Sequence, residues 1–390
     1  MSRHGAALDC AGGIRTAHSA LPSTTDAVKA LQAQLGTGSF DHIIAFFSLA
    51  HDPHDVSAAL ASAFPNVPLS GCSTAGEISA GGISEGSIVL VAFPPGPFRV
   101  RSALIDTEGA LAVQRATEIA RDLRKQLAGD RTAPLKERVF ALLLMDGLSN
   151  SEEMLVAAVN WAIDDIQLVG GSAGDGLRFE RTALLHAGRV VSRGAILLMV
   201  ETSVPFRVFK TQNFEPTPIK LVVTAADSEN RIVHELNAEP AAREYAAAIG
   251  LMPDDLGPFS FASYPLVVKV GGDYYCRSIR NMNPDGSLSF FCAIDEGLVF
   301  TVARPEDMLN STVRVLDQVA SELGGVDCIL AFDCILRRLD AENRQIKRNL
   351  EDIYRKHHVV GFHTYGEQYR SMHLNQTLTG IAFASGGAQP

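Results

Sequence analysis

"PLSGCSTAGEIS", residues 68–79, returns in outline near the other end of the chain as "VVGFHTYGEQ", residues 359–368. A third version, "QLVGGSAGDG", occupies residues 167–176. In each version an apolar strand runs into two closely spaced glycines, and an acidic residue follows the second glycine. Another apolar strand and a helix-like stretch lie upstream of each version. We therefore predict one supersecondary unit that is used three times.

The predicted unit is a right-handed crossover of strand, helix and strand. Continuous apolar runs in its strands are typical of parallel strands buried on both faces. Glycine permits a sharp reversal at the carboxyl end of a strand, where open α/β sheets bind ligands. The acids after the glycines are therefore expected beside a crevice: Glu77, Asp175 and Glu367. The first strands of the three units are "HIIAFFS" (42–48), "VFALLLM" (139–145) and "VDCILAF" (326–332).

These patterns predict an α/β protein whose repeated strand-helix-strand units form mixed sheets in two domains. The length of 390 residues also favours more than one domain. We expect the following parts: an N-terminal extension at 1–36 with a short helix near its end, a first domain at 37–226 with two pseudo-repeats, a second domain at 227–382 and a tail at 383–390.

Composition narrows the classes of partner. The formal net charge of -10 argues against a protein that holds a nucleic-acid backbone. The apolar runs fall far short of the roughly 20 residues needed to cross a membrane, and the first residues show no secretion signal, so we expect a cytoplasmic protein. The six cysteines are scattered without C-x-x-C spacing, and we expect them to be reduced and buried.

Motifs for catalysis are weak. Residues 170–174 spell G-x-S-x-G around Ser172, but an esterase elbow continues into a helix, whereas "AGDGL" follows here. The sequence holds neither an H-E-x-x-H motif nor a Walker loop. We therefore expect a binding protein and not an enzyme.

Three segments together resemble the FIST family. They are "GCSTAGEI" near the start, "NAEPAAREY" in the middle and "GFHTYGEQYRSMHLNQTLTG" near the end. The resemblance covers roughly residues 37–380 as an N- and a C-terminal FIST domain. It implies a sensory input module that binds a small ligand and acts in bacterial signal transduction.

One group of stand-alone FIST proteins binds haem b and senses nitric oxide, and this chain resembles that group because it carries no attached signalling domain. The resemblance implies noncovalent haem b, nitric oxide as the sensed ligand, and control of biofilm behaviour. It also implies a partner in trans, either a sensor histidine kinase or a diguanylate cyclase or phosphodiesterase, and it leaves a homodimer open. The alternatives are a FIST module for a small organic ligand such as an amino acid, without haem, and a plain scaffold.

A candidate ligand site lies in "QYRSMHLNQTLTGIAFA", residues 368–384, taken as one strand. Alternation places Met372 and Leu374 on a core face, and His373, Asn375 and Thr377 on a polar, uncharged face. Such a face beside a glycine-rich turn suits a small-molecule pocket. An exposed edge strand is the competing interpretation.

A haem site requires a neutral imidazole as axial ligand of the iron. Of the eleven histidines, His373 is our first choice, because Asn375 and Thr377 could orient its ring, and His363 in the turn is second. Since no C-x-x-C-H motif is present, the haem would be held noncovalently. In "FDCILRRL", Arg337 or its neighbour Arg338 could bind a ligand carboxylate, with a solvated surface position as the alternative. The full predicted cofactor-binding set is His373, His363, Asn375, Thr377, Tyr365, Glu367 and Arg337.

Overall fold

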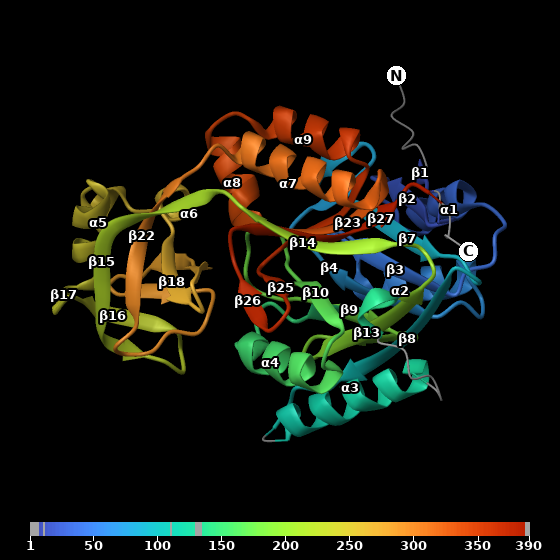
Figure 1. The fold of residues 1–390 in the computed structure, drawn as a ribbon, viewed down its shortest axis with the longest axis horizontal. Coiled ribbons are helices and arrows are strands. Elements are labelled where there is room, and N and C mark those ends of the chain that lie inside the picture. The colour runs from blue at the N-terminus through green and yellow to red at the C-terminus, as the bar shows by residue number, and fades with distance from the viewer. Residues whose placement is uncertain (1–7, 11, 110, 129–134, 387–390) are drawn as a thin grey trace.

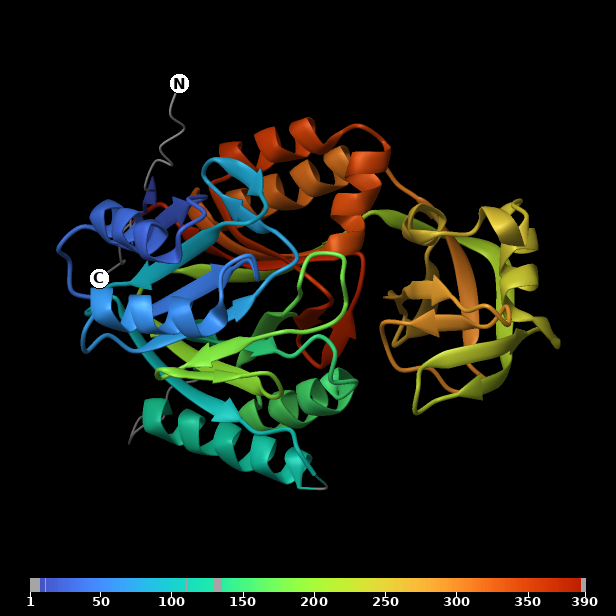
Figure 2. The same cartoon turned by 180° about the vertical axis from the view of Figure 1, so that it is seen from behind.

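The computed structural model describes residues 8–10, 12–109, 111–128 and 135–386. A large body is built from three copies of one α/β unit, and a small domain stands to one side of it (Figures 1 and 2). Residues 1–7 and 11 of the predicted extension, and 387–390 of the predicted tail, lie outside the described residues. No helix in the described part of the chain is long and apolar enough to cross a membrane.

Each copy contains the predicted parallel pair of strands with a helix between them, which confirms the α/β class and the threefold repeat. In the first copy, Ile43 pairs with Leu69, and the Asp52 side chain caps the helix that begins at Pro53. The elements are β3 (His42–Phe47), α2 (Pro53–Ala63) and β4 (Leu69–Ser73); β9 (Val139–Met145), α4 (Glu152–Ile163) and β10 (Gln167–Ser172); and β23 (Val326–Cys334), α8 (Ile335–Asn343), α9 (Lys347–Lys356) and β24 (Val359–Thr364).

Further elements complete each copy in the same order. A strand and a helix precede the parallel pair, and a short hairpin and a long return strand follow it. Before the pairs come β2 (Arg15–Ser19) and α1 (Thr24–Leu35), β8 (Phe98–Ile105) and α3 (Ala112–Ala128), and β14 (Phe206–Gln212) and α7 (Met308–Leu323). After them come β5 (Glu77–Ser79), β6 (Gly82–Ser84) and β7 (Ile88–Phe93); β11 (Leu184–His186), β12 (Arg189–Val191) and β13 (Ala195–Thr202); and β25 (Glu367–Tyr369), β26 (Met372–Leu374) and β27 (Thr377–Ala384).

The hairpins are exchanged between copies. The hairpin of the second copy extends the sheet of the first, where Leu184 pairs with Cys72. The hairpin of the first copy extends the sheet of the third, where β5 pairs with β24, and the hairpin of the third extends the sheet of the second, where β25 pairs with β10. The three sheets are therefore tied into a closed cycle in which no copy is complete alone.

The three sheets share one apolar core and are covered on their outer faces by helices. Helices α1 and α2 pack on the first sheet, α3 and α4 on the second, and α7 and α9 on the third (Figure 1). The inner faces meet in a cluster of buried aromatic rings, in which Phe46 lies 4.7 Å from Phe362 and 6.5 Å from Phe332 between ring centroids. This arrangement explains the continuous apolar runs, since each strand is buried on both faces.

One glycine of each turn motif is required by the close pairing of the two parallel strands. A Cβ atom at Gly361 would overlap the carbonyl oxygen of Ala331 on the neighbouring strand. A Cβ atom at Gly71 or at Gly170 would likewise overlap the carbonyl oxygen of the facing residue on the neighbouring strand of the same copy. The repeated glycines therefore record a backbone contact and not a phosphate cradle.

The small domain is inserted into the third copy, between β14 and α7. Its antiparallel sheet wraps around a core that includes Tyr245, Phe261, Phe290 and Phe300. Its elements are β15 (Phe214–Asp227), β16 (Ile232–Leu236), β17 (Glu239–Pro240), α5 (Ala241–Ile249), α6 (Pro258–Ser263), β18 (Leu266–Val270), β19 (Asp273–Arg277), β20 (Ile279–Met282), β21 (Leu288–Phe290) and β22 (Val299–Pro305). Outside it, β1 (Leu8–Asp9) pairs with β2, and short 3-10 helices span Leu135–Glu137 and Pro253–Asp255.

The spatial division of the chain differs from the predicted boundary near residue 226. Strand β14 pairs along its length with β27, from Phe206 opposite Phe383 to Gln212 opposite Thr377, so residues 308–384 belong to the body with the first two copies. The predicted extension at 1–36 also belongs there in part, because β2 pairs with β7 and α1 covers the first sheet.

The stretch at 368–384, expected as one strand, comprises the end of β25, then β26 and β27, in two different sheets. The chain turns at Asn375 and Gln376, where Gln376 has φ 57°. As a result β26 extends the second sheet, while β27 is central to the third. His373 and Thr377 therefore do not share a strand face, and the alternation argument fails at this turn.

Candidate functional site

The three glycine-rich turns meet and bind one another through their backbones. The first turn bonds the third, with Ala75 N–H donating to His363 C=O at 2.9 Å and His363 N–H to Gly76 C=O at 2.7 Å. The second turn bonds the first through Gly174 N–H and Ser73 C=O at 3.1 Å, and it bonds the third through Ser172. The repeated motif thus forms a closed ring at the carboxyl ends of the parallel strands.

The acid of the first and third turns is buried inside the ring. Glu77 accepts hydrogen bonds from the Thr74 hydroxyl and from both the N–H and hydroxyl of Ser87, at 3.1 and 2.6 Å for Ser87. Glu367 is held in the same manner by Thr364 and Thr377. Burial raises the pKa of Glu77 to about 7 and that of Glu367 to about 8, against the opposite effect of these hydrogen bonds.

The second turn uses its acid differently. The Asp175 carboxylate accepts the backbone N–H groups of Phe179, Glu180 and Arg181 at 2.8, 3.0 and 3.0 Å, and the hydroxyl of Tyr365 from the third turn. Burial acts to raise the pKa of Asp175, but the Tyr365 and backbone hydrogen bonds together lower it. Asp175 therefore orders the loop that follows it, residues 176–181.

The two histidines that are predicted as haem ligands are buried in close packing. His373 is 2% exposed, and its Nδ1 lies 3.4 Å from Gln368 Nε2. A Cβ atom at Gly366 would lie 2.6 Å from His373 Nε2, so the ring packs directly on the glycine backbone. His363 is 0% exposed, and its Nδ1 lies 3.5 Å from Asp333. Burial lowers the pKa of His373 to about 4 and holds that of His363 well below its usual value.

The other predicted site residues are also buried, in structural roles. Arg337 donates to Asp333 at 2.7 Å, Asn213 at 2.8 Å and Thr312 at 3.0 Å, so its fork is already engaged. Asn375 donates to the backbone carbonyl of Tyr365 at 3.1 Å. The structure thus brings Tyr365, Glu367, Asn375 and Thr377 together in the third turn, while Arg337 supports the buried network behind it.

The turn ring borders a pocket of about 580 Å³ that reaches the surface. It lies between the first turn, the loop after the second turn and helix α8. Its polar wall includes Arg338, Glu85 and Asp175. The full lining is Ser48, Leu49, Ala50, Thr74, Ala75, Gly76, Glu77, Glu85, Gly86, Asp175, Gly176, Leu177, Arg178 and Arg338. A concave site of this size suits a small organic molecule.

Arg338 is the buried cation of this pocket, with a side chain that is 7% exposed, whereas Arg178 is exposed. Its Nε donates to Glu342 at 2.9 Å, and its Nη1 donates to the carbonyl of Ala75 at 3.0 Å. Its Nη2 pairs with Glu85, whose own side chain is 66% exposed at the mouth of the pocket. The guanidinium is thus fixed from behind, and its front is covered by a carboxylate that can leave into solvent.

Comparison with known proteins identifies the family. The FIST N domain matches residues 41–239, and the FIST C domain matches residues 241–370. The chain belongs to the FIST family. It is also similar to the uncharacterized protein MJ1623 of Methanocaldococcus jannaschii, with 26% identity over 359 residues, which is 81% of this chain and 67% of that protein.

The boundary between the FIST N and FIST C matches runs through the small domain and not between the small domain and the large body. The FIST N match ends at Glu239 in β17, and the FIST C match begins at Ala241, the first residue of α5. The chain is thus a FIST sensory-domain protein whose two sequence domains interlock in space.

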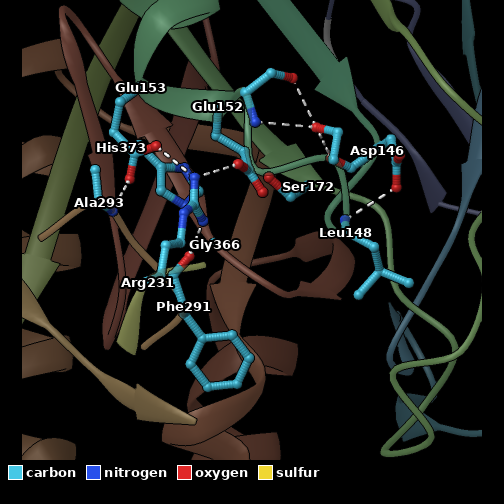
Figure 3. A network of polar contacts seen from close by, with 12 residues as sticks. Asp146, Leu148, Glu152, Glu153, Ser172, Arg231, Phe291, Ala293, Gly366 and His373 are labelled. Atoms are coloured by element: carbon cyan, nitrogen blue, oxygen red, sulfur yellow. Dashed lines mark hydrogen bonds and ion pairs between the residues drawn. The ribbon is translucent and has the colours of Figure 1, made fainter. Parts of the chain in front are cut away.

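The joint between the small domain and the FIST body is charged and buried (Figure 3). Arg231 of the small domain donates to Glu152 at 2.8 Å and to Glu153 at 2.7 Å, both at the start of α4. The N–H of Ala293 donates to Glu153 at 2.7 Å, and His373 lies beside this pair. Burial raises the pKa of Glu152 to about 7 despite the charge of Arg231.

The sequence reasoning missed most of the pocket. Glu85 and the loop at 175–178 come from two different copies, and they meet only because the turns form a ring. Of the two adjacent arginines, Arg338, and not Arg337, lines the pocket. Residue spacing could not separate them, because Arg337 has an acid four residues before it, Asp333, and Arg338 has one four residues after it, Glu342.

Proposed function

We propose that this FIST protein is a sensory module that binds a small carboxylate-bearing organic ligand in the turn-ring pocket. The supporting observation is Arg338, a buried, pre-positioned guanidinium whose front partner is the exposed Glu85. An arginine fork binds a carboxylate through charge-assisted hydrogen bonds, and these gain strength where water is excluded.

Glu85 acts in this proposal as a stand-in for the ligand. Its carboxylate holds the Nη2 side of Arg338 until a ligand carboxylate replaces it. Because the Glu85 carboxylate is 66% exposed and regains its full hydration when it leaves, this exchange costs little. The neighbouring Gly86 has φ 71°, a conformation that gives the tip of this loop a tight turn.

Haem b fits the packing poorly. Neither His373 nor His363 lines any of the four main pockets in the described residues, and both rings lie in close packing. A haem ligand needs an open slot beside its imidazole. We therefore rank the small organic ligand above haem and nitric oxide, and haem sensing stays a prediction from the family resemblance.

The output of the module would reach a separate enzyme. We retain a sensor histidine kinase or a diguanylate cyclase or phosphodiesterase as the partner in trans, in the cytoplasm, because this follows from the sensory role of FIST domains. A homodimer, and the absence of nucleic-acid binding, remain predictions of the sequence.

The test is calorimetric titration of the purified protein with acetate, the L-amino acids and succinate, with acetamide as the uncharged control. We expect at least one carboxylate to bind, and Arg338→Ala to weaken it on the order of thirtyfold or more, because a partly buried charge pair is lost. Arg348→Ala, on the exposed face of α9, is the matched control.

The absorbance spectrum of the same samples tests whether the protein binds haem. A Soret band after expression with a haem precursor, lost in His373→Ala or His363→Ala, together with no carboxylate binding, would overturn the proposal in favour of haem.

A further inference from the structure

The loop at residues 175–181 forms one wall of the turn-ring pocket and also touches the small domain. Asp175, Gly176, Leu177 and Arg178 line the pocket. The next residue, Phe179, turns away from it with φ 56°, a left-handed conformation that is unusual for a bulky residue. Pocket and small domain are therefore contacted by consecutive residues of one loop.

Phe179 is the middle ring of a three-ring stack. Its centroid lies 4.5 Å from that of Tyr365, with 30° between the planes, and 5.5 Å from that of Phe291, at 52°. Tyr365 belongs to the third turn, and Phe291 follows β21 in the small domain. Aromatic pairs at these separations contribute about 0.5–1.5 kcal/mol beyond their buried area.

Hydrogen bonds to Asp175, Gly176 and Tyr365 hold the shape of the loop. The Asp175 carboxylate binds the N–H groups of Phe179, Glu180 and Arg181, and the Tyr365 hydroxyl binds Asp175. A ligand that contacts Asp175 to Arg178 therefore acts on the element that positions Phe179. The carboxylate cluster and the ring stack move together because Tyr365 belongs to both.

The small domain is attached to the body in a way that permits it to tilt. Two chain crossings join them, at Asn213 and at residues 305–307, next to each other on the β15 and β22 strands. Besides the ring stack, polar contacts across the joint include the Arg231 pair with Glu152 and Glu153, Ala293 with Glu153 at 2.7 Å, Ser263 with Asp340 at 2.9 Å, and Gln376 with the Phe261 carbonyl at 3.2 Å. A buried apolar cluster, in which Ala262 and Phe291 pack against Ile335, Leu336 and Leu339 of α8, also spans the joint. Two chain crossings that lie next to each other form a single hinge line, about which the packed contacts on the α4 and α8 side of the joint set the tilt.

We infer that the loop at 175–181 couples ligand occupancy of the turn-ring pocket to the tilt of the small domain, through the stacking of Phe179 on Phe291. A bound ligand fixes the loop in the arrangement described here and so holds the small domain against the body. The inference deepens the proposed function and rests on it for the identity of the pocket. By linkage, the ligand favours the held position of the small domain by a certain factor, and a substitution that abolishes this position must weaken ligand binding by the same factor.

The experiment measures the distance between the body and the small domain by double electron–electron resonance. Spin labels are placed at Lys125→Cys on α3 and Glu229→Cys on the small domain, both exposed positions. The six native cysteines are buried and free, so the labels select the introduced thiols. The probe is the tightest-binding member of the series acetate, L-amino acids and succinate.

We expect the ligand to narrow the distance distribution of the otherwise unaltered protein. Phe179→Ala should broaden the ligand-free distance distribution and remove its response to the ligand. Phe291→Ala, which removes the other ring of this pair, should have the same two effects. Phe291→Ala, which lies outside the pocket, should also weaken the ligand by about threefold or more. Glu180→Ala, at an exposed position of the same loop that does not line the pocket, should leave the ligand-free distribution unchanged.

The ligand titration tests the proposed function, and the distance measurements test the coupling. If no carboxylate of the series binds, the proposed function fails, and the ligand-free distributions still test whether Phe179 and Phe291 hold the small domain against the body. Equal ligand-free distributions for the parent, Phe179→Ala and Phe291→Ala would overturn the coupling, as would tight ligand binding that leaves the distance unchanged.

Discussion

The Tyr365 hydroxyl hydrogen-bonds the carboxylate of Asp175, although 190 residues separate them in the chain. This bond joins the third turn to the second and completes the ring of turns. We predict that Tyr365→Phe, which keeps the ring stack but removes the hydroxyl, destabilises the protein by about 1.5–3 kcal/mol, because Asp175 loses a charge-assisted bond. Urea unfolding measures the loss.

Hydrogen exchange locates the effect of the same substitution. The amides of Phe179, Glu180 and Arg181 should exchange faster in Tyr365→Phe, because they depend on the Asp175 carboxylate. Tyr369→Phe, on the neighbouring hairpin, is the matched control. Unchanged protection of these three amides in Tyr365→Phe would contradict the role assigned to the bond.

The buried acids predict a pH dependence with a definite sign. The pKa of Glu367 rises from its ordinary value to about 8 on folding, so the folded state binds the proton more tightly than the unfolded state. Its contribution to stability is therefore greatest at low pH and is lost as pH rises toward 8. Glu367→Gln should flatten the profile between pH 5 and 8 by on the order of 1–3 kcal/mol relative to the parent.

Urea midpoints at several pH values test this prediction. Glu229→Gln, at an exposed position, should reproduce the parent profile. A Glu367→Gln profile parallel to that of the parent would show that the acid does not titrate as its burial implies.

The glycines at the strand pairs should tolerate no side chain. Gly361→Ala would force a Cβ atom into the carbonyl oxygen of Ala331, and backbone cannot move aside as a side chain can. We expect a loss of at least about 3 kcal/mol or failure to fold. Gly257→Ala, with open space around it, should stay within about 0.5 kcal/mol of the parent in urea unfolding. A stable Gly361→Ala protein would refute the packing argument.

The charged joint should be sensitive to loss of its cation. Arg231→Ala leaves Glu152 and Glu153 without their shared partner in a buried site, and we expect about 3–5 kcal/mol of destabilisation. Arg243→Ala breaks an exposed pair with Glu239 and should cost less than about 1 kcal/mol. Limited proteolysis at the two crossings reports the loosened joint. Equal cleavage of the two variants would argue against Arg231 as the link.

The threefold repeat could be predicted from sequence because each copy solves the same packing problem. Gly71, Gly170 and Gly361 recur where two parallel strands approach closely, and the strands are apolar because both faces are covered. The exchange of hairpins could not be predicted, since it depends on the closure of three sheets around one core. The insertion of the small domain was hidden for a similar reason, because β14 and β27 pair across the whole insert.

The candidate site was predicted less well. Alternation across residues 368–384 continues without interruption in the sequence, and only the left-handed turn at Gln376 separates His373 from Thr377. Arg337 and Arg338 are adjacent, so composition could not decide which one faces the pocket. About 100° of helix rotation separates them, and it buries the first and presents the second.

The most direct test of the ligand-binding claim is the affinity of the best carboxylate for Glu85→Gln beside Arg338→Ala. Glu85→Gln removes the competing charge and should tighten binding about two- to fivefold, because solvent around the exposed Glu85 carboxylate screens its attraction to Arg338. Arg338→Ala should weaken it on the order of thirtyfold or more. Opposite changes in the two variants are the predicted result. Equal affinities in both variants and the parent, measured by calorimetry, would contradict the account.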